Sequence, residues 1–338
     1  MSYKKILFTK PKVVEICDYE IAEPDAGEVQ VRLAVSSISS GTERANILGE
    51  VNVSVFEKSN VAIFPREGGY SSAGIIEKVG PDVADFQVGD RVALSWSSHS
   101  QVLNIEQENV YKLSDNVSFQ DAAFFHIATF PLAAIRKCRL EMGESAIVMG
   151  MGILGLAALQ LLQVAGAAPI IAVDPVAEKR EKALQCGADY ALDPYASDFA
   201  ETVQRLTDGG AKVAIEVTGV GKALDSVLDC MARYGWVALL GCTRTSDFTI
   251  YYYHKVHGPG ITLVGAHASA RPQSESSNGW WTQRDDIHTL MKLTEMGRLS
   301  LGSMIDEVHS PMEAVEVYNR LANEKTFPLV QFDWSKLS

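Results

Sequence analysis

Apolar and polar side chains alternate in the first part of the chain. Valine or leucine stands at positions 29, 31, 33 and 35, and Gln, Arg and Ala stand between them. This period of two is typical of a strand with one buried face. Residues 69–80 predict another strand between glycines, and residues 88–92 predict a turn into a further strand. No helical period precedes Asp121, so we expect a β-rich region over about the first 125 residues.

The pattern changes near residue 130, where short apolar runs begin to alternate with helical segments. The runs at 145–149, 170–173, 212–217, 236–240 and 261–264 predict strands, and the segments 156–165, 177–185 and 223–233 predict helices. Strands that are apolar throughout are buried on both faces, so this alternation indicates a doubly wound parallel sheet. In the tail, a helix over 286–296 is expected to end at Gly297, and Ser310 with Glu313 predicts a capping box at a last helix.

The composition limits the classes of partner and compartment. The 338 residues suggest two domains, and the net charge of −12 argues against nucleic acid or an anionic membrane as a partner. No apolar run reaches the roughly 18–20 residues of a membrane span, and the first ten residues predict a strand, not a signal peptide. The five cysteines form no Cys-x-x-Cys pair, so we expect no disulfide framework and a cytoplasmic location.

A glycine motif follows the apolar run at 145–149. Gly150, Gly152 and Gly155 enclose Met151, Ile153 and Leu154 and open a predicted helix. The first glycine would make a tight turn, the second would let the backbone approach a pyrophosphate, and the third would let helix and strand pack closely. The helix N-terminus would offer N–H groups to the phosphates. The motif in this context predicts a dinucleotide site.

Asp174 ends the next predicted strand, nineteen residues beyond Gly155. An acid at this place accepts the ribose hydroxyls of NAD and repels the 2′-phosphate of NADP, so NAD is the expected cofactor. Lys179 and Arg180 lie nearby and weigh towards NADP. Asp174 could instead cap the helix that follows Pro175.

The order of these parts resembles the medium-chain dehydrogenase/reductase superfamily, and most closely its zinc-type alcohol, sorbitol and threonine dehydrogenases. The resemblance spans nearly the whole chain and is carried by the motifs at 40–43, 69–71, 88–92, 150–155, 216–219, 240–241 and 264–265. It implies an α/β fold with a GroES-like catalytic domain over 1–130 and 271–338 and a Rossmann domain over 131–270. It also implies substrate binding between the domains, and it assigns Thr129, Thr218, Gly219, Gly241 and Gly265 to the cofactor.

The chain departs from this family at the zinc ligands. The ligand cysteine of the family falls on Ser40, its histidine on Tyr70, the neighbouring glutamate on Ser71 and the third ligand on His126. A catalytic zinc needs three ligands from Cys, His, Asp and Glu. Of these positions only His126 qualifies, and the cysteine-rich structural lobe is missing, so no metal is expected.

Without zinc, hydrogen-bonding groups must stabilise or protonate a developing oxyanion. The candidates are Tyr70, His126, Thr42 and Ser40, and Thr42 matches the hydroxyl that relays protons in the family. Each has a structural alternative: His126 as a buried core histidine, Tyr70 as a packing residue bonded to backbone, and Ser40 as a filler for the lost cysteine.

Other conspicuous residues favour structural interpretations. Glu43 is expected to pair with Arg44 or a backbone amide, and His99 is expected to lie in a surface loop. The two tryptophans at 280–281 could stack on a sugar ring or cover the cleft, but burial against the protein or against a partner subunit is favoured. The three tyrosines at 251–253 could form a sheet edge at a subunit interface, and a homodimer or homotetramer is expected.

Three functions remain open from the residues. The first is reversible oxidation of a secondary alcohol on a polar, sugar-, polyol- or cyclitol-like small molecule by NAD, with Tyr70 or His126 handling the proton. The second is NAD(P)H-dependent reduction of a conjugated C=C bond, as in zinc-free quinone or enoyl reductases. The third is a non-catalytic NAD-binding sensor. The sequence leaves the substrate and the direction of reaction undetermined.

Overall fold

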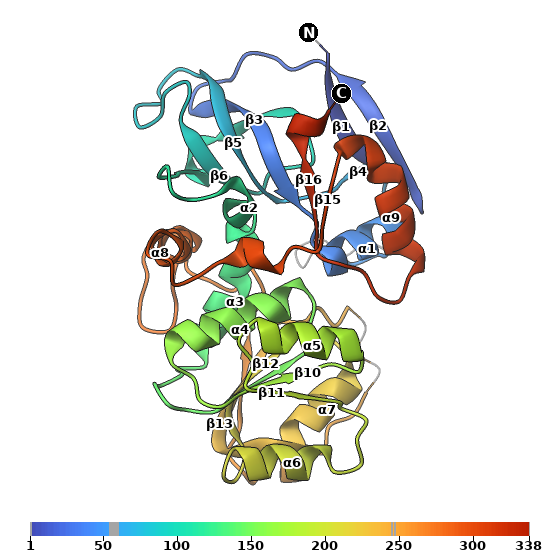
Figure 1. The fold of residues 1–338 in the computed structure, drawn as a ribbon, viewed down its shortest axis with the longest axis vertical. Helices are drawn as coiled ribbons and strands as arrows, with labels where there is room; N and C mark the ends of the chain where they lie inside the picture. Colours follow the sequence, from blue (N-terminus) through green and yellow to red (C-terminus); the bar gives the residue numbers. More distant parts are fainter. Residues whose placement is uncertain (1, 54–60, 245, 247, 338) are drawn as a thin grey trace. The chain divides into compact units, whose positions relative to one another are not determined.

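The computed structural model describes residues 2–53, 61–244, 246 and 248–337 (Figure 1). Its internal contacts divide the chain into two units. The first unit joins Met1–Ile127 with Met291–Ser338, and the second is Ala128–Leu290. The segment 271–290, which the resemblance assigned to the first domain, falls in the second unit by this division.

The first unit is built on strands that pair antiparallel, except for the parallel pair β15 and β16. One sheet has the order β2-β1-β4, and the larger sheet has the order β15-β16-β3-β5-β6-β8, with β7 also paired to β3. These strands are β1 (Tyr3–Lys10), β2 (Val13–Tyr19), β3 (Glu28–Ser37), β4 (Arg66–Glu67), β5 (Ser71–Val79), β6 (Arg91–Ser95), β7 (Val102–Glu106), β8 (Val110–Lys112), β15 (Glu307–His309) and β16 (Val330–Asp333). The alternation at 29–35 is therefore confirmed as a strand, with positions 29, 31, 33 and 35 all buried.

Helices and short turns complete the first unit. They are α1 (Ser40–Leu48), α2 (Phe119–Ala122), α9 (Ala314–Asn323) and the 3₁₀ turns Gln107–Asn109, Leu301–Met304, Pro311–Glu313 and Trp334–Lys336. The predicted capping box is confirmed, because the Ser310 side chain accepts a backbone amide and Glu313 bonds back to the Ser310 amide. A core formed by Phe8, Tyr318, Phe332 and neighbouring aliphatic residues joins β1, α9 and β16.

The second unit is a six-stranded parallel sheet in the order β11-β10-β9-β12-β13-β14. Its strands are β9 (Ala146–Met149), β10 (Ile170–Val173), β11 (Tyr190–Leu192), β12 (Ala211–Glu216), β13 (Met231–Leu239) and β14 (Thr262–Gly265). Its helices are α4 (Ile153–Ala165), α5 (Ala177–Gln185), α6 (Phe199–Leu206) and α7 (Gly221–Asp229), with a π-helical turn at Tyr253–His257. Helices α4 and α5 lie on one face of the sheet and α6 and α7 on the other (Figure 1). This is the strand order of a dinucleotide-binding Rossmann fold.

Two helices cross the boundary between the units: α3 (Phe125–Lys137) and α8 (Gln283–Glu295). The predicted helix end at Gly297 is confirmed, because this glycine has φ +66° and its amide donates to the Thr294 carbonyl. Its missing side chain allows the left-handed conformation that ends the helix.

Several elements differ from the sequence prediction. Helix α1 lies in the β-rich region where no helix was expected. It was not predicted because its buried residues Glu43, Ala45 and Ile47 are spaced by two, as buried residues are in a strand. Helix α7 ends at Asp229, because β13 already begins at Met231. The pair β11 and α6 was not predicted, since β11 is only partly buried and three residues long.

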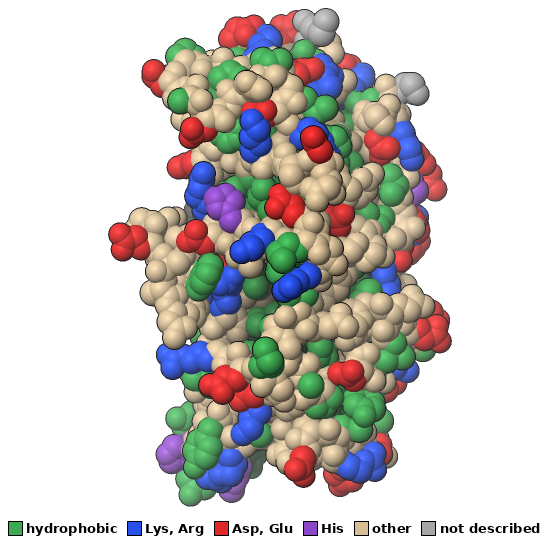
Figure 2. All heavy atoms as spheres, turned by 60° about the vertical axis from the view of Figure 1, so that its left-hand side comes forward, with side chains coloured by type: hydrophobic (Ala, Val, Ile, Leu, Met, Phe, Trp, Pro, Cys, Tyr) green, Lys and Arg blue, Asp and Glu red, His purple; other side chains and the backbone are tan. Residues whose placement is uncertain are grey.

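On the face drawn in Figure 2, acidic and basic side chains are interspersed. Within the described residues, no helix has the length and apolar character that crossing a bilayer requires.

Candidate functional site

The glycine-rich turn between β9 and α4 has the geometry that a dinucleotide cradle needs. Gly150 has φ +103°, and a Cβ there would lie 2.8 Å from the Thr218 side chain. A Cβ on Gly155 would lie 1.9 Å from the Gly150 carbonyl oxygen, so only glycine permits this approach of helix and turn. A Cβ on Gly152 would meet nothing within 4 Å. Gly152 therefore borders open space at the start of α4, where Ile153 and Leu154 present the first helical amides.

Asp174 ties the end of β10 to this turn. Its Oδ2 accepts the Met151 amide at 2.8 Å, and its Oδ1 accepts the Val176 amide at 2.9 Å. The residue is 5% exposed. Val176, not Asp174, is the N-cap of α5, and Asp174 forms a turn with it. The carboxylate thus lies against the glycine-rich turn, and each oxygen keeps a lone pair for a further donor.

The loops after β12 and β13 touch through glycines. A Cβ on Gly241 would lie 2.1 Å from the Gly219 nitrogen, and Gly219 has φ +67°. Buried Glu216 organises this contact by accepting the amides of Thr218 at 2.7 Å and Gly219 at 3.1 Å. Burial raises the pKa of Glu216, against the lowering effect of these hydrogen bonds. Sequence analysis noted Glu216 only as part of the motif at 216–219, because no residue pattern marks a side chain that accepts the amides two and three residues ahead.

The remaining cofactor candidates lie at separate places in the second unit. Thr129 is fully buried, and the Arg271 guanidinium lies 3.4 Å from both its carbonyl oxygen and its Oγ1. Gly265 is exposed at the end of β14. Lys179 is half-buried on α5 and lies one residue before Arg180, whose guanidinium donates to the Asp174 carbonyl.

Buried cations hold the loop after β14. The Lys137 ammonium donates to the carbonyls of Gly265 at 3.1 Å and Ala270 at 2.5 Å, and burial followed by repulsion from Arg271 lowers its pKa to about 8. The Arg136 guanidinium lies 3.1 Å from the Asp286 carboxylate. It also covers the Trp281 ring at 3.5 Å.

The two adjacent tryptophans of this loop have different environments. Trp281 is partly buried beneath Arg136, whereas Trp280 remains 42% exposed, with Lys137 over its ring. Within this chain Trp281 is thus partly buried and Trp280 keeps an exposed face, and burial of Trp280 against a partner subunit stays a prediction.

In the first unit, three rings form an aromatic corner that we define as Tyr70, Trp96 and His126. The His126 ring meets Trp96 edge-on at 4.4 Å and Tyr70 edge-on at 5.5 Å between centroids. His126 is buried, Tyr70 is half-buried and Trp96 is 55% exposed. Trp96 was not singled out from the sequence. In the structure it has a φ of +58°, which is unusual for a bulky residue, and its amide donates to the Tyr70 carbonyl.

The Tyr70 hydroxyl lies at the N-terminus of α1. It hydrogen-bonds the Ser39 hydroxyl at 2.5 Å, and Ser39 is the N-cap of this helix. Ser40 and Thr42 lie in the first turn and are half-buried. Ser39 therefore makes the contact to Tyr70, while Ser40 occupies the neighbouring position. The positive end of the helix dipole favours negative charge here.

Two residues given structural interpretations from sequence are now placed. His99 is fully buried at 0% exposure, so the expectation of a surface loop was wrong. Glu43 accepts the Ser39 amide at 2.7 Å, whereas Arg44 donates to the Glu324 carbonyl.

The three tyrosines at 251–253 are exposed, and the last of them, Tyr253, begins the π-helical turn. None of them lies in a strand, so they do not form a sheet edge.

At the positions to which the resemblance assigns the zinc ligands, the side chains present match a catalytic zinc poorly. Ser40, Tyr70 and Ser71 present hydroxyl groups, and His126 alone is of a type that zinc prefers. Across the described residues, no group of three or more His, Cys, Asp and Glu side chains is placed to hold a metal ion.

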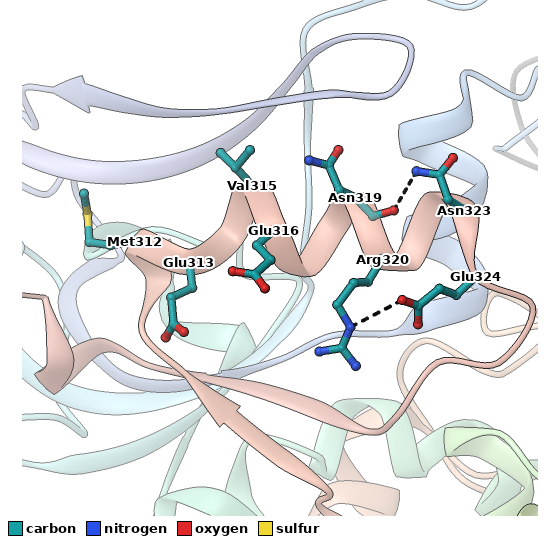
Figure 3. Close-up of a pocket in the computed structure, with 8 residues that line it drawn as sticks. All are labelled: Met312, Glu313, Val315, Glu316, Asn319, Arg320, Asn323 and Glu324. Carbon is teal, nitrogen blue, oxygen red and sulfur yellow. Dashed lines mark hydrogen bonds and ion pairs between the residues drawn. The ribbon is translucent and has the colours of Figure 1, made fainter.

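A hollow along α9 lies apart from these residues. It is lined by Met312, Glu313, Val315, Glu316, Asn319, Arg320, Asn323 and Glu324 (Figure 3). Its lining is a solvent-facing side of one helix, where Asn323 bonds Asn319 and Arg320 lies near Glu324. Apart from Glu313 of the capping box, it contains none of the residues singled out from the sequence, and we assign it no role.

Comparison with known proteins gives matches along most of the chain. A family model described as the alcohol dehydrogenase GroES-like domain matches residues 25–129, and one described as zinc-binding dehydrogenase matches residues 154–279. The D-guloside 3-dehydrogenase of Escherichia coli strain K12 is 27% identical, over 95% of this chain and 96% of its own length.

Solved structures agree in fold. An alcohol dehydrogenase from Escherichia coli CFT073 in complex with NADH superposes with a TM-score of 0.83 at 18% identity, covering 98% of this chain and 99% of that chain. A protein described as a zinc-binding dehydrogenase from Sinorhizobium meliloti 1021, bound to NADP, has a TM-score of 0.81, also at 18% identity with 98% and 99% coverage.

Proposed function

The chain belongs to the medium-chain dehydrogenase/reductase superfamily, and from this premise we propose that it interconverts a secondary alcohol and a ketone with NAD(H) and without zinc. The proposed substrate is polar and sugar-, polyol- or cyclitol-like. The observation that carries the proposal is the half-buried Tyr70 hydroxyl at the N-terminus of α1, at a position where the family places a zinc ligand.

Residues of the second unit support the choice of cofactor. A bound nicotinamide dinucleotide would supply the acceptor for the hydrogen removed from the carbinol carbon. Gly150, Gly152 and Gly155 would hold its pyrophosphate, and Asp174 would accept the ribose hydroxyls. Because one related structure carries NADH and another NADP, the preference for NAD rests on Asp174, whose carboxylate would repel a 2′-phosphate.

Residues of the first unit would manage the proton. In ketone reduction, Tyr70 would transfer its hydroxyl proton to the developing alkoxide. The Ser39 hydroxyl, which accepts from Tyr70 in the structure, would turn to donate a hydrogen bond to the resulting phenolate, and a proton from solvent would restore Tyr70. The Tyr70–Ser39 pair can reverse direction because each hydroxyl both donates and accepts. The α1 dipole would favour the negative charge during this transfer. His126 is buried behind Tyr70 and Trp96, so we assign it to orienting their rings.

The exposed Trp96 ring supports a carbohydrate-like substrate. Indole rings offer a flat apolar face, and 55% of Trp96 is exposed beside the candidate proton donor. The 27% sequence identity to a D-guloside 3-dehydrogenase supports a sugar hydroxyl as the reacting group.

We predict that Tyr70→Phe lowers kcat by about 100-fold and leaves NADH affinity within about twofold, because only the proton-handling hydroxyl is lost. The assay follows NAD reduction with a panel of glycosides, polyols and cyclitols, and NADH binding by fluorescence. Tyr195→Phe, on the exposed surface of the second unit, is the matched control and should retain full activity.

Wild-type turnover by Tyr70→Phe would remove Tyr70 from the mechanism. Rapid NADH oxidation with an enone panel, together with no oxidation of any alcohol, would instead establish reduction of C=C bonds.

A further inference from the structure

A buried polar network lies beneath the aromatic corner of the first unit. Its centre is the pair His99 and Glu43, whose Nε2 and Oε2 atoms are 3.1 Å apart and whose side chains are 0% and 2% exposed. Glu43 comes from α1, and its second partner, Tyr318, comes from α9, which packs beside α1 (Figure 1). An ionisable pair so deeply buried is stable only when its hydrogen bonds are satisfied.

The partners of Glu43 are all donors. The Ser39 amide donates to Oε1 at 2.7 Å, and the Tyr318 hydroxyl donates to Oε2 at 2.5 Å. Burial, reinforced by the Glu43 carboxylate, raises the pKa of Tyr318 well above its usual value, so this phenol keeps its proton. Glu43 is thus held as an acceptor on both oxygens.

The other ring nitrogen of His99 contacts a serine that is itself hydrogen-bonded. The Trp334 indole donates to the Ser36 hydroxyl at 2.9 Å, and Ser36 lies 2.8 Å from the His99 Nδ1. Both ring nitrogens of His99 therefore have a polar partner, Ser36 on Nδ1 and Glu43 on Nε2. With its hydrogen on Nε2, the ring donates to Glu43 and accepts from the Ser36 hydroxyl.

Two routes lead from this pair to Tyr70. Through Ser39, Glu43 holds the amide of the residue whose hydroxyl bonds Tyr70. Through the preceding backbone, the His99 amide donates to the Gly68 carbonyl at 3.0 Å. A Cβ on Gly69, which has φ +82°, would lie 3.0 Å from the His99 ring, so the turn before Tyr70 rests directly on His99.

We propose that His99 and Glu43 are a positioning pair, which fixes the direction of the Tyr70 hydroxyl from both its hydrogen-bond partner and its backbone. Neither residue reaches the exposed side of the aromatic corner, so both act through Tyr70. The proposal rests on the proposed function, in which Tyr70 handles the substrate proton. Small displacements of such a group reduce turnover without changing cofactor binding.

The test is a double-mutant cycle of His99→Phe with Tyr70→Phe in the full chain. Phenylalanine keeps the ring volume and removes both side-chain hydrogen bonds. We expect His99→Phe alone to lower kcat by about tenfold at unchanged KM for NAD, and to lower it by less than about twofold further in the Tyr70→Phe background. Folding is checked by NADH binding and thermal unfolding.

Gln331→Met is the matched control. Gln331 is buried in the same unit, and its amide donates to the Ser37 hydroxyl and the Gln120 carbonyl, neither of which belongs to the pair. The Gln331→Met variant should lose stability and retain kcat. If His99 had only a structural role, His99→Phe would do the same. If His99→Phe fails to fold, Glu43→Gln takes its place in the same cycle.

The outcomes separate the two proposals. If Tyr70→Phe alone keeps wild-type turnover, the proposed function fails and the positioning role fails with it. If Tyr70→Phe is impaired but the His99 variant retains kcat, or lowers it equally in both backgrounds, only the positioning role is overturned.

Discussion

At the scale of single residues, glycines set the geometry of the candidate cofactor site. Gly155 is required because the Gly150 carbonyl occupies the space of its side chain, whereas Gly152 borders open space. The same motif therefore contains one packing glycine and one glycine that leaves room for a ligand. Sequence spacing predicted both roles, and the structure distinguishes them by what a Cβ would meet.

We predict opposite consequences for alanine at these two positions. Gly155→Ala should lower the free energy of unfolding by about 1–3 kcal/mol and abolish NADH binding, because backbone atoms must move. Gly152→Ala should unfold like the wild type and bind NADH more weakly, because its Cβ would occupy the approach of the pyrophosphate. Denaturant unfolding and fluorescence titration measure the two effects. A Gly155→Ala protein with wild-type stability would contradict the packing role.

At the scale of elements, an ion-pair cluster joins β15 to α9. The Arg320 guanidinium bonds both oxygens of Glu307 at 2.8 and 3.0 Å, and His309 bonds Glu307 and Glu313. The bonds from Arg320 lower the pKa of Glu307 to about 2, although burial opposes this. Burial also lowers the pKa of His309, but its two carboxylate partners outweigh that and leave it raised.

The stabilisation by Glu307 should depend on pH in a defined direction. Because its pKa is lowered on folding, its contribution is complete above about 4.5 and is lost as the pH falls towards 2. We expect Glu307→Gln to cost about 1 kcal/mol at pH 5.5, where His309 is charged, and the difference from wild type to shrink towards pH 2.5. Denaturant unfolding at a series of pH values measures this, with the exposed Glu108→Gln as control. A difference that grows on acidification would refute the assignment.

At the scale of the whole molecule, the two units have separate cores and separate candidate roles. The second unit holds the glycine-rich turn and Asp174, and the first holds Tyr70 and the aromatic corner. Anything that binds the folded second unit should stabilise it by mass action. For the same reason, removing a bound structural zinc with a chelator would lower the stability of the protein.

Thermal unfolding should therefore separate the possible ligands. NADH at 100 times its Kd should raise the free energy of unfolding by about 2.7 kcal/mol, and NADPH at the same concentration should raise it less, because Asp174 repels the 2′-phosphate. Chelator treatment should change neither the melting temperature nor turnover. A larger shift with NADPH would overturn the NAD preference, and loss of turnover restored by zinc would overturn the zinc-free mechanism.

The sequence by itself determined the elements whose signals are local. The parallel strands β9 and β10, helix α5, the glycine-rich turn and the capping box at Ser310 follow from periodicity, glycine spacing and capping chemistry within about ten residues. Helix α1 escaped prediction because its buried positions alternate as they do in a strand, and only packing against α9 and β1 selects the helix.

Only the tertiary structure decided the environment of Tyr70. His99 lies among serines in the sequence, which is the composition of a surface loop. In the structure it is hydrogen-bonded by Glu43, Ser36 and the Gly68 carbonyl, which come from distant segments of the chain. Trp96 gains its place beside Tyr70 and His126 in the same way. Burial and hydrogen-bond partners arise from contacts far apart in sequence, and no local pattern encodes them.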